Sequence, residues 1–329
     1  MRRIGFAVVL ALSLALTPLV THAQQRSAMP VLGILHSTSP SLLGSTFLQG
    51  LREEGYVEGQ NIRIEYRSPE GAYERLPALA AELVALRVTA ILALGTPAAR
   101  AAKTASVKVT PAIPVVFSMA SDPVTDGFVA SLNRPGGNIT GVTSIAGGLA
   151  PKRLDLIREV LHKDAAVAIL INPANPLSAA EHKGTADAAR AIGQRLDVVT
   201  ASNQNEIEQA FATIKQRRIG ALIIAADIFF YSQMKRLAAL AAQYAVPAIG
   251  PLREFATEGG LLSYGASVRE VTRQAGVVAG KVLKGTRPED LPVQQPTKFE
   301  LVLNLKTAKA LGLTIPQSIV VWADEVIHP

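Results

Sequence analysis

The sequence predicts an α/β protein made of two similar lobes, each with a parallel β-sheet covered by helices. Short apolar runs rich in β-branched residues alternate along the 329-residue chain with longer stretches rich in Ala, Leu, Lys and Glu. Most of the apolar runs contain no polar residue, which is typical of strands buried on both faces. The runs fall into two sets of about five, and a chain of this length is sufficient for two domains.

The expected strands follow one another in chain order. In the first lobe they are 31–35, 62–66, 90–94, 114–117 and 139–143. In the second lobe they are 166–171, 197–200, 221–225, 247–249 and 261–264, followed by a last strand at 300–304. The run 62–66 alternates, with Arg63 and Glu65 between its apolar residues, so we expect it at the edge of its sheet.

The segments between these strands have apolar residues at helical spacing, such as Leu76, Leu79 and Leu83, so we expect helices to connect the strands. A further helix over 268–284 ends at Gly285, because a lysine in the last turn before a glycine is a stop signal. Alternating strands and helices of this length predict right-handed crossover units. We expect residues 24–145 and 266–290 to form the first lobe and residues 146–265 and 291–329 to form the second.

The N-terminus has the order of a secretory signal at residues 1–23. Met1-Arg2-Arg3 is basic, an apolar run follows, and Thr21-His22-Ala23 supplies the small residues of a cleavage site. A membrane anchor is the alternative, but the run is shorter than the roughly 20 apolar residues that a spanning helix needs. The sequence has no cysteine, which excludes disulfides, a thiolate metal site and a lipid anchor. We therefore expect a soluble protein in the periplasm of a Gram-negative cell.

Several classes of function find little support in the sequence. The formal net charge is +7, but the basic residues are scattered and do not form the stripe typical of a nucleic-acid binder. The segment Gly276–Lys281 is one residue too short for a phosphate loop and lies within a predicted helix. The sequence contains no paired-histidine metal motif and no nucleophile elbow, and only His36 faces the expected cleft. We expect no catalytic residue, no metal site and no cofactor.

The junctions between strands and helices are the candidate site, because ligands in open α/β sheets bind beyond the carboxyl ends of the strands. At Gly95-Thr96-Pro97, Thr96 can cap the helix and Pro97 can occupy its first turn. The same pattern recurs at Ser39-Pro40, Asp122-Pro123 and Asn175-Pro176. Helix starts of this kind suit an anion, although each of them can equally serve only to begin its helix.

Two carboxylates lie at such junctions. Asp122 precedes a proline, and a capping role accounts for it. Asp227 follows the strand 221–225 and precedes the aromatic residues Phe229, Phe230 and Tyr231. Because a buried carboxylate needs a partner, the ammonium group of a ligand is one candidate partner for Asp227.

Two long segments of the chain resemble a known family. They are SDPVTDGFVASLNRPGGNITGV at 121–142 and QPTKFELVLNLKTAKALGL at 295–313, with shorter matches NPANP at 172–176, GGLLSYG at 259–265 and ADEVI at 323–327. These segments resemble the ABC transporter substrate-binding protein family that includes tryptophan/tyrosine-type binders. The resemblance covers essentially the whole chain after the signal.

The resemblance implies the type I periplasmic-binding fold, a Venus-flytrap clamp of two Rossmann-like lobes with parallel sheets joined by a multi-crossover hinge. It implies the solute-binding component of an ABC-type importer that captures a small molecule, such as an aromatic amino acid or a similar carboxylate. The partners would be that ligand and an ABC permease in the inner membrane, and the protein would be a monomer. The alternative is a sensor that presents its solute to a membrane receptor.

The resemblance also gives a set of candidate ligand-binding residues. The matching cleft positions are Thr96 with the backbone that follows it, Asp122, Asn172 and Asp227, and the full set of candidates adds Ser37, Pro97 and Tyr264. In this hypothesis Thr96 and the helix start after it hold an anionic end, Asp227 holds a cationic end, and Asn172 binds from the second lobe. Apolar walls would come from Phe117, Phe229 or Tyr264.

Overall fold

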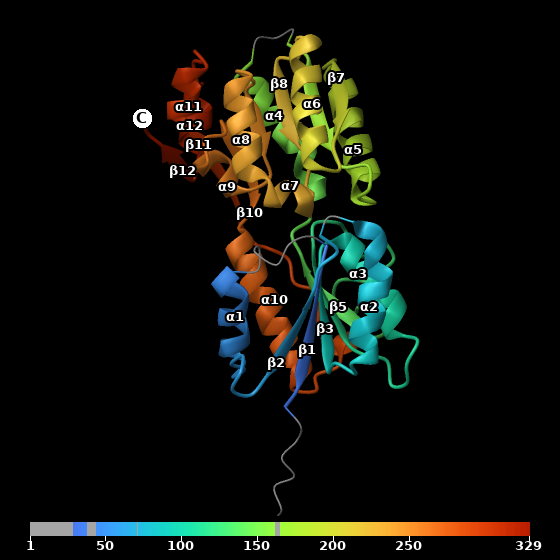
Figure 1. Ribbon diagram of the computed structural model, residues 1–329. Helices are drawn as coiled ribbons and strands as arrows, with labels where there is room; N and C mark the ends of the chain where they lie inside the picture. The colour runs from blue at the N-terminus through green and yellow to red at the C-terminus, as the bar shows by residue number, and fades with distance from the viewer. Residues whose placement is uncertain (1–28, 38–43, 71, 162–164) are drawn as a thin grey trace, which may run out of the picture.

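The computed structural model describes residues 29–37, 44–70, 72–161 and 165–329, which form two lobes, one above the other (Figure 1). The signal expected at 1–23 and the junction Ser39-Pro40 lie outside the described residues. Within the described ranges, no helix combines the length and the apolar character needed to cross a membrane.

The first lobe contains a five-stranded parallel sheet in the order β2-β1-β3-β4-β5. Its strands are β1 (Val31–His36), β2 (Arg63–Arg67), β3 (Ala90–Leu94), β4 (Val115–Met119) and β5 (Ile139–Thr143). The helices packed around it are α1 (Gly44–Glu53), α2 (Leu76–Ala85), α3 (Thr96–Ser106) and α10 (Val268–Leu283), with short 3-10 turns η2 (Tyr73–Arg75) and η4 (Pro288–Asp290). The edge position predicted for 62–66 is confirmed, since β2 ends the sheet.

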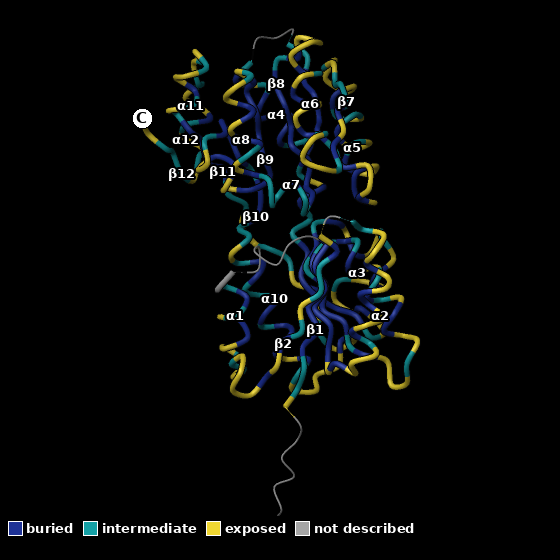
Figure 2. Tube along the Cα trace, in the orientation of Figure 1, coloured by how far each residue is buried: buried dark blue, intermediate teal, exposed yellow. Residues whose placement is uncertain are grey.

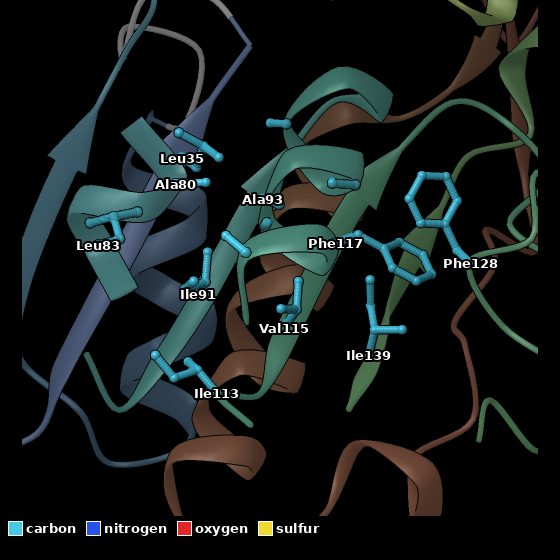
Figure 3. Packing of buried hydrophobic residues seen from close by; sticks show 14 of the residues in the cluster. Leu35, Ala80, Leu83, Ile91, Ala93, Ile113, Val115, Phe117, Phe128 and Ile139 are labelled. Atoms are coloured by element: carbon cyan, nitrogen blue, oxygen red, sulfur yellow. The ribbon is translucent and has the colours of Figure 1, made fainter. Parts of the chain in front are cut away.

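Apolar residues cover both faces of this sheet, as a parallel sheet between helices requires. One face packs against α2 and α3, where Leu83, Ile91 and Phe117 belong to one buried cluster (Figure 3). The other face packs against α1 and α10 and includes Ile34 and Leu92. Strands β1, β3, β4 and β5 are accordingly the most continuously buried segments of the lobe (Figure 2), whereas the edge strand β2 is partly exposed.

The second lobe contains a seven-stranded sheet in the order β12-β11-β10-β9-β8-β6-β7. Its strands are β6 (Val167–Ile171), β7 (Leu196–Thr200), β8 (Ala221–Ile224), β9 (Ala248–Gly250), β10 (Leu262–Ala266), β11 (Phe299–Asn304) and β12 (Glu325–Ile327). Its helices are α4 (Ala150–Glu159), α5 (Leu177–Ala191), α6 (Gln204–Gln216), α7 (Ile228–Ser232), α8 (Met234–Gln243), α9 (Arg253–Thr257), α11 (Leu305–Ala310) and α12 (Gln317–Trp322), with the 3-10 turn η3 (Ala146–Leu149).

This sheet departs from the fully parallel arrangement expected from the sequence. Strand β11 runs antiparallel to β10, because the chain returns from the first lobe before β11 begins. The short strand β12 then adds to β11 in parallel and was not predicted.

The chain passes between the lobes three times. It leaves the first lobe after β5, returns after β10 to form α10, and enters the second lobe again before β11. The last passage is held against the first lobe, where Gln294 forms a bridge to Val142 and Val293 packs into the buried cluster.

The segment Gly276–Lys281 lies inside α10, as the sequence suggested, and its glycines serve helix packing. A Cβ atom at Gly276 would lie 2.3 Å from the carbonyl oxygen of Phe47 on α1. A Cβ atom at Gly50 on α1 would lie 2.0 Å from the carbonyl oxygen of Arg273 on α10. The two helix backbones are therefore in direct contact, which only glycine allows at these positions.

We predict that Gly276→Val lowers the free energy of unfolding by about 1–3 kcal/mol, because the added side chain forces α1 away from α10. The matched control is Gly184→Ala on α5, where a Cβ atom meets nothing within 4 Å. This control should raise the free energy of unfolding by about 0.5–1 kcal/mol, through helix propensity alone. Urea unfolding measures both, and equal stability of Gly276→Val and the wild-type protein would contradict the packing argument.

Candidate functional site

A cavity of about 100 Å³ lies between the two lobes, at the carboxyl ends of the parallel strands. First-lobe residues on its wall include the ends of β1, β3 and β4 and the turn after β3, and second-lobe residues follow β6, β8 and β9. The lining residues are His36, Leu94, Gly95, Thr96, Pro97, Ser118, Met119, Ala120, Ser144, Ala146, Asn175, Leu177, Ala226, Ile228, Tyr231, Pro251, Leu252, Ala266, Val268, Val271 and Thr272. None of these lining residues is an Asp, Glu, Lys or Arg.

The turn from β3 into α3 forms part of the first-lobe wall. Gly95 has a φ of +90°, and a Cβ atom there would lie 2.7 Å from the Ser37 hydroxyl oxygen. The Ser37 hydroxyl accepts a hydrogen bond from the Ala98 N–H at 3.1 Å, so Ser37 performs the capping that the sequence suggested for Thr96. The Thr96 hydroxyl instead lies 3.0 Å from the Ser121 hydroxyl. Thr96 and Pro97 both line the cavity at the start of α3.

His36 is the last residue of β1 and lies on the same wall. Its side chain is 2% exposed, and its Nε2 atom has no hydrogen-bond partner. Burial lowers the pKa of His36 to about 4, so its imidazole is uncharged at neutral pH.

Asp227 is the acceptor in a buried cluster of the second lobe. Its carboxylate accepts hydrogen bonds from the side chains of Asn175, at 2.6 Å, and Asn172, at 3.3 Å. It also caps α7 by accepting the N–H groups of Phe229, at 2.7 Å, and Phe230, at 3.2 Å. Burial raises the pKa of Asp227, and these four donors oppose that shift.

The Asp227 cluster lies directly behind the cavity wall. Asn175 lines the cavity itself, while its amide group bonds Asp227 and its carbonyl oxygen accepts the Leu177 N–H at 3.1 Å. Asn172 holds the same loop, since its carbonyl side-chain oxygen accepts the Ala174 N–H at 3.0 Å. The structure thus brings Asn172 and Asp227 together, and Asn175 connects them to the cavity.

The remaining sequence candidates lie outside the cavity lining. Asp122 is exposed, and its carboxylate bonds Val124 and Thr125 of its own turn, which does not continue into a helix. The Tyr264 ring packs against Phe299 at a centroid distance of 6.3 Å. Of the other rings considered as walls, Phe117 packs against Phe128 in the first-lobe core, and Phe229 packs against Phe230.

Sequence reasoning missed most of the apolar lining. Met119, Leu177 and Tyr231 face the cavity from β4, α5 and α7. The only signal for them was their position just after a predicted strand, a position that many other residues share. The proximity of Tyr231 to the cavity depends on the turn at Asp227, which the sequence does not specify.

A buried ion pair supports the second-lobe wall. Arg153 on α4 and Glu181 on α5 have fully buried side chains and lie 2.8 Å apart. Arg153 also donates to the carbonyl oxygen of Ala146 at 3.0 Å, and Glu181 accepts the N–H of Ala226 at 3.0 Å. Burial raises the pKa of Glu181, while Arg153 and the Ala226 N–H lower it in part. Because Ala146 and Ala226 line the cavity, the pair fixes the backbone of that wall.

The similarity of the chain to known proteins agrees with this geometry. The family model described as ABC transporter substrate binding protein matches residues 30–327, so the chain belongs to this family. The resemblance stated from the sequence motifs is thereby confirmed.

Three individual relatives share between 24% and 27% of the aligned residues. A tyrosine-binding protein of Clostridioides difficile (strain R20291) is 27% identical over 267 residues, covering 81% of this chain and 75% of that protein. The structure of an ABC domain from Streptococcus pneumoniae in complex with L-Trp is 25% identical, has a TM-score of 0.79, and covers 91% of this chain and 99% of that one. A conserved domain protein from Vibrio cholerae is 24% identical with a TM-score of 0.81, at the same coverage. The predicted two-lobed type I periplasmic-binding fold is confirmed.

We predict that Arg153→Met lowers the free energy of unfolding by about 3–5 kcal/mol at pH 8, because it leaves the Glu181 carboxylate buried without a counter-charge. The loss should be smaller at pH 5. Without Arg153, the folded-state pKa of Glu181 rises further above its unfolded value, so its unfavourable contribution grows as the pH rises from the unfolded pKa.

Chemical unfolding at pH 8 and pH 5 measures the free energy of unfolding of each variant. Two further variants serve as controls. Arg190→Met removes an exposed partner of Asp187 and should change stability by less than about 0.5 kcal/mol. Arg153→Met combined with Glu181→Leu should recover part of the loss, since no unpaired charge then remains. A loss independent of pH and unrelieved in the double variant would refute the ion-pair explanation.

Proposed function

We propose that this chain is the periplasmic solute-binding component of an ABC-type importer and captures a small molecule, an aromatic amino acid or a similar carboxylate, between its lobes. The observation that carries the proposal is the cavity at the strand ends, which receives residues from both lobes of a member of the substrate-binding family. Relatives described as tyrosine-binding and as bound to L-Trp support the ligand class.

The anionic end of the ligand would lie at the start of α3. The N-terminus of this 11-residue helix faces the cavity at Thr96 and Pro97, where the helix dipole and backbone N–H groups favour a negative charge. Met119, Leu177 and Tyr231 offer an apolar surface for a ring. The cationic end would lie on the second-lobe side, where Asn175 separates the cavity from the Asp227 carboxylate.

Capture would work by closure of the two lobes around the ligand. A solute that contacts both lobes stabilises the closed arrangement by the difference between its affinities for the closed and open forms. The closed protein, a monomer delivered to the periplasm by the signal at 1–23, would then dock on the permease in the inner membrane. In this proposal the protein acts by binding and catalyses no reaction.

We predict that Phe, Tyr or Trp raises the melting temperature of the refolded protein in a thermal-shift screen of the twenty amino acids, small carboxylates, amides and purines. Ligand at a hundredfold excess over Kd adds about 2.7 kcal/mol, which corresponds to a shift of several degrees. Thr96→Val and Asp227→Asn should reduce this ligand-induced shift. Thr213→Val on α6 also removes a hydroxyl hydrogen bond, but Thr213 does not line the cavity, so this variant should leave the shift unchanged.

The variant Asp122→Ala separates the two roles considered for this residue. Loss of a turn cap lowers the melting temperature of free and liganded protein equally, whereas loss of a ligand contact lowers only the ligand-induced shift. A shift with a compound outside the aromatic amino acids would reject the proposed ligand class. The absence of any shift across the whole panel would reject the proposed capture of these solutes.

A further inference from the structure

The cavity contains one buried polar group that the protein leaves without a hydrogen bond. Among the described residues, several buried side-chain atoms lack a partner, including the Tyr73 hydroxyl and the Ser263 hydroxyl. Of these, only the Nε2 atom of His36 belongs to a residue that lines the cavity between the lobes. A buried polar atom without a partner is unfavourable, so a bound solute that supplies the missing hydrogen bond gains affinity from it.

Three other polar side chains on the cavity wall already have protein partners. The Thr96 hydroxyl pairs with Ser121, and the Thr272 hydroxyl donates to the Val268 carbonyl oxygen within α10. Asn175 uses its amide group for Asp227 and its oxygen for the Leu177 N–H. The hydroxyl groups of Ser118 and Tyr231 also line the cavity, but among the described lining residues only the Nε2 atom of His36 is both fully buried and without a hydrogen-bond partner.

His36 lies on a different side of the first-lobe sheet from the start of α3. Successive side chains of a strand point to opposite faces, and the next residue, Ser37, binds the Ala98 N–H of α3. Ile34, two residues before His36, packs in the cluster that contains Val271 of α10. The imidazole thus faces the cavity beside α10. A solute whose anionic group lies at the start of α3 can therefore still bind the imidazole through a second group.

The chemistry of the imidazole limits what this second group can be. Burial keeps His36 uncharged at neutral pH, and among the described residues that line the cavity none has a formally charged side chain. An uncharged imidazole has one N–H donor and one lone pair, which suit an amine or a hydroxyl group.

We propose that His36 is a specificity-determining residue of this site, whose Nε2 atom hydrogen-bonds an amine or hydroxyl group of the solute. The inference rests on the proposed function. It narrows the ligand class to solutes that carry an apolar body, an anionic end and a second polar group. Carboxylates with an apolar body alone would bind without the contribution of His36.

The test is a cycle of protein and ligand variants measured by calorimetry. The protein variants are the wild type, His36→Phe, which keeps a ring of similar shape, and Ser263→Ala as the matched control. Ser263 is 1% exposed and also lacks a partner, but it does not line the cavity. The probes are L-tyrosine, L-phenylalanine, which lacks the phenol hydroxyl, and 3-phenylpropanoate, which lacks the amine as well.

We predict that His36→Phe weakens L-tyrosine binding about tenfold, and that Ser263→Ala leaves it unchanged. This loss of affinity should disappear with L-phenylalanine if His36 binds the phenol hydroxyl group. It should disappear only with 3-phenylpropanoate if His36 binds the amine. The melting temperature of the ligand-free His36→Phe variant should equal or exceed that of the wild type, since no structural hydrogen bond is removed. An equal loss for all three probes, no loss for any of them, or a lower melting temperature of the free variant would overturn the proposal.

Failure of the proposed function would look different. If the wild type binds none of these three probes, native mass spectrometry of protein purified without refolding decides the role of His36. A small-molecule adduct present on the wild type and on Ser263→Ala but missing from His36→Phe would support it. The same adduct on all three proteins, or none on the wild type, would overturn it.

Discussion

The ion pair between Arg153 and Glu181 is the interaction on which the second-lobe wall of the cavity depends. Both charges are removed from water, a cost that a single pair seldom recovers. Here the two side chains also bind backbone groups of Ala146 and Ala226, which reach the cavity from the end of the first crossing and from the end of β8. The pair therefore joins α4, α5 and two strand ends into one unit, and it defines the shape of the wall more than it adds stability.

The same arrangement recurs around the cavity, where polar groups are oriented by partners behind the wall. Ser37 holds the start of α3, and Asp227 holds both Asn172 and Asn175. Side chains fixed in this way need little reorganisation when a ligand enters, which lowers the entropic cost of binding. His36 differs from them because its Nε2 has no partner of its own.

The architecture fits movement of the lobes as two rigid bodies. Each sheet has apolar clusters on both faces, so each lobe has a complete core of its own. The connections between the lobes are three crossings, and α10 returns to the first lobe, where it contacts α1 through Gly50 and Gly276. Residues from both lobes nevertheless meet at the cavity, since a Cβ atom at Gly95 would lie 3.4 Å from the Ile228 side chain.

The sequence by itself determined the alternation of strands and helices, the edge position of β2 and the family, because these depend on local hydrophobic patterning and on long contiguous motifs. It also selected Thr96, Pro97 and Asp227 as residues at strand ends, which the structure places on or directly behind the cavity wall. Only the tertiary structure decided that Ser37 caps α3 in place of Thr96, that Arg153 meets Glu181, and that β11 runs antiparallel. These features join residues far apart in the chain, and their partners follow from how the elements pack and not from the local pattern.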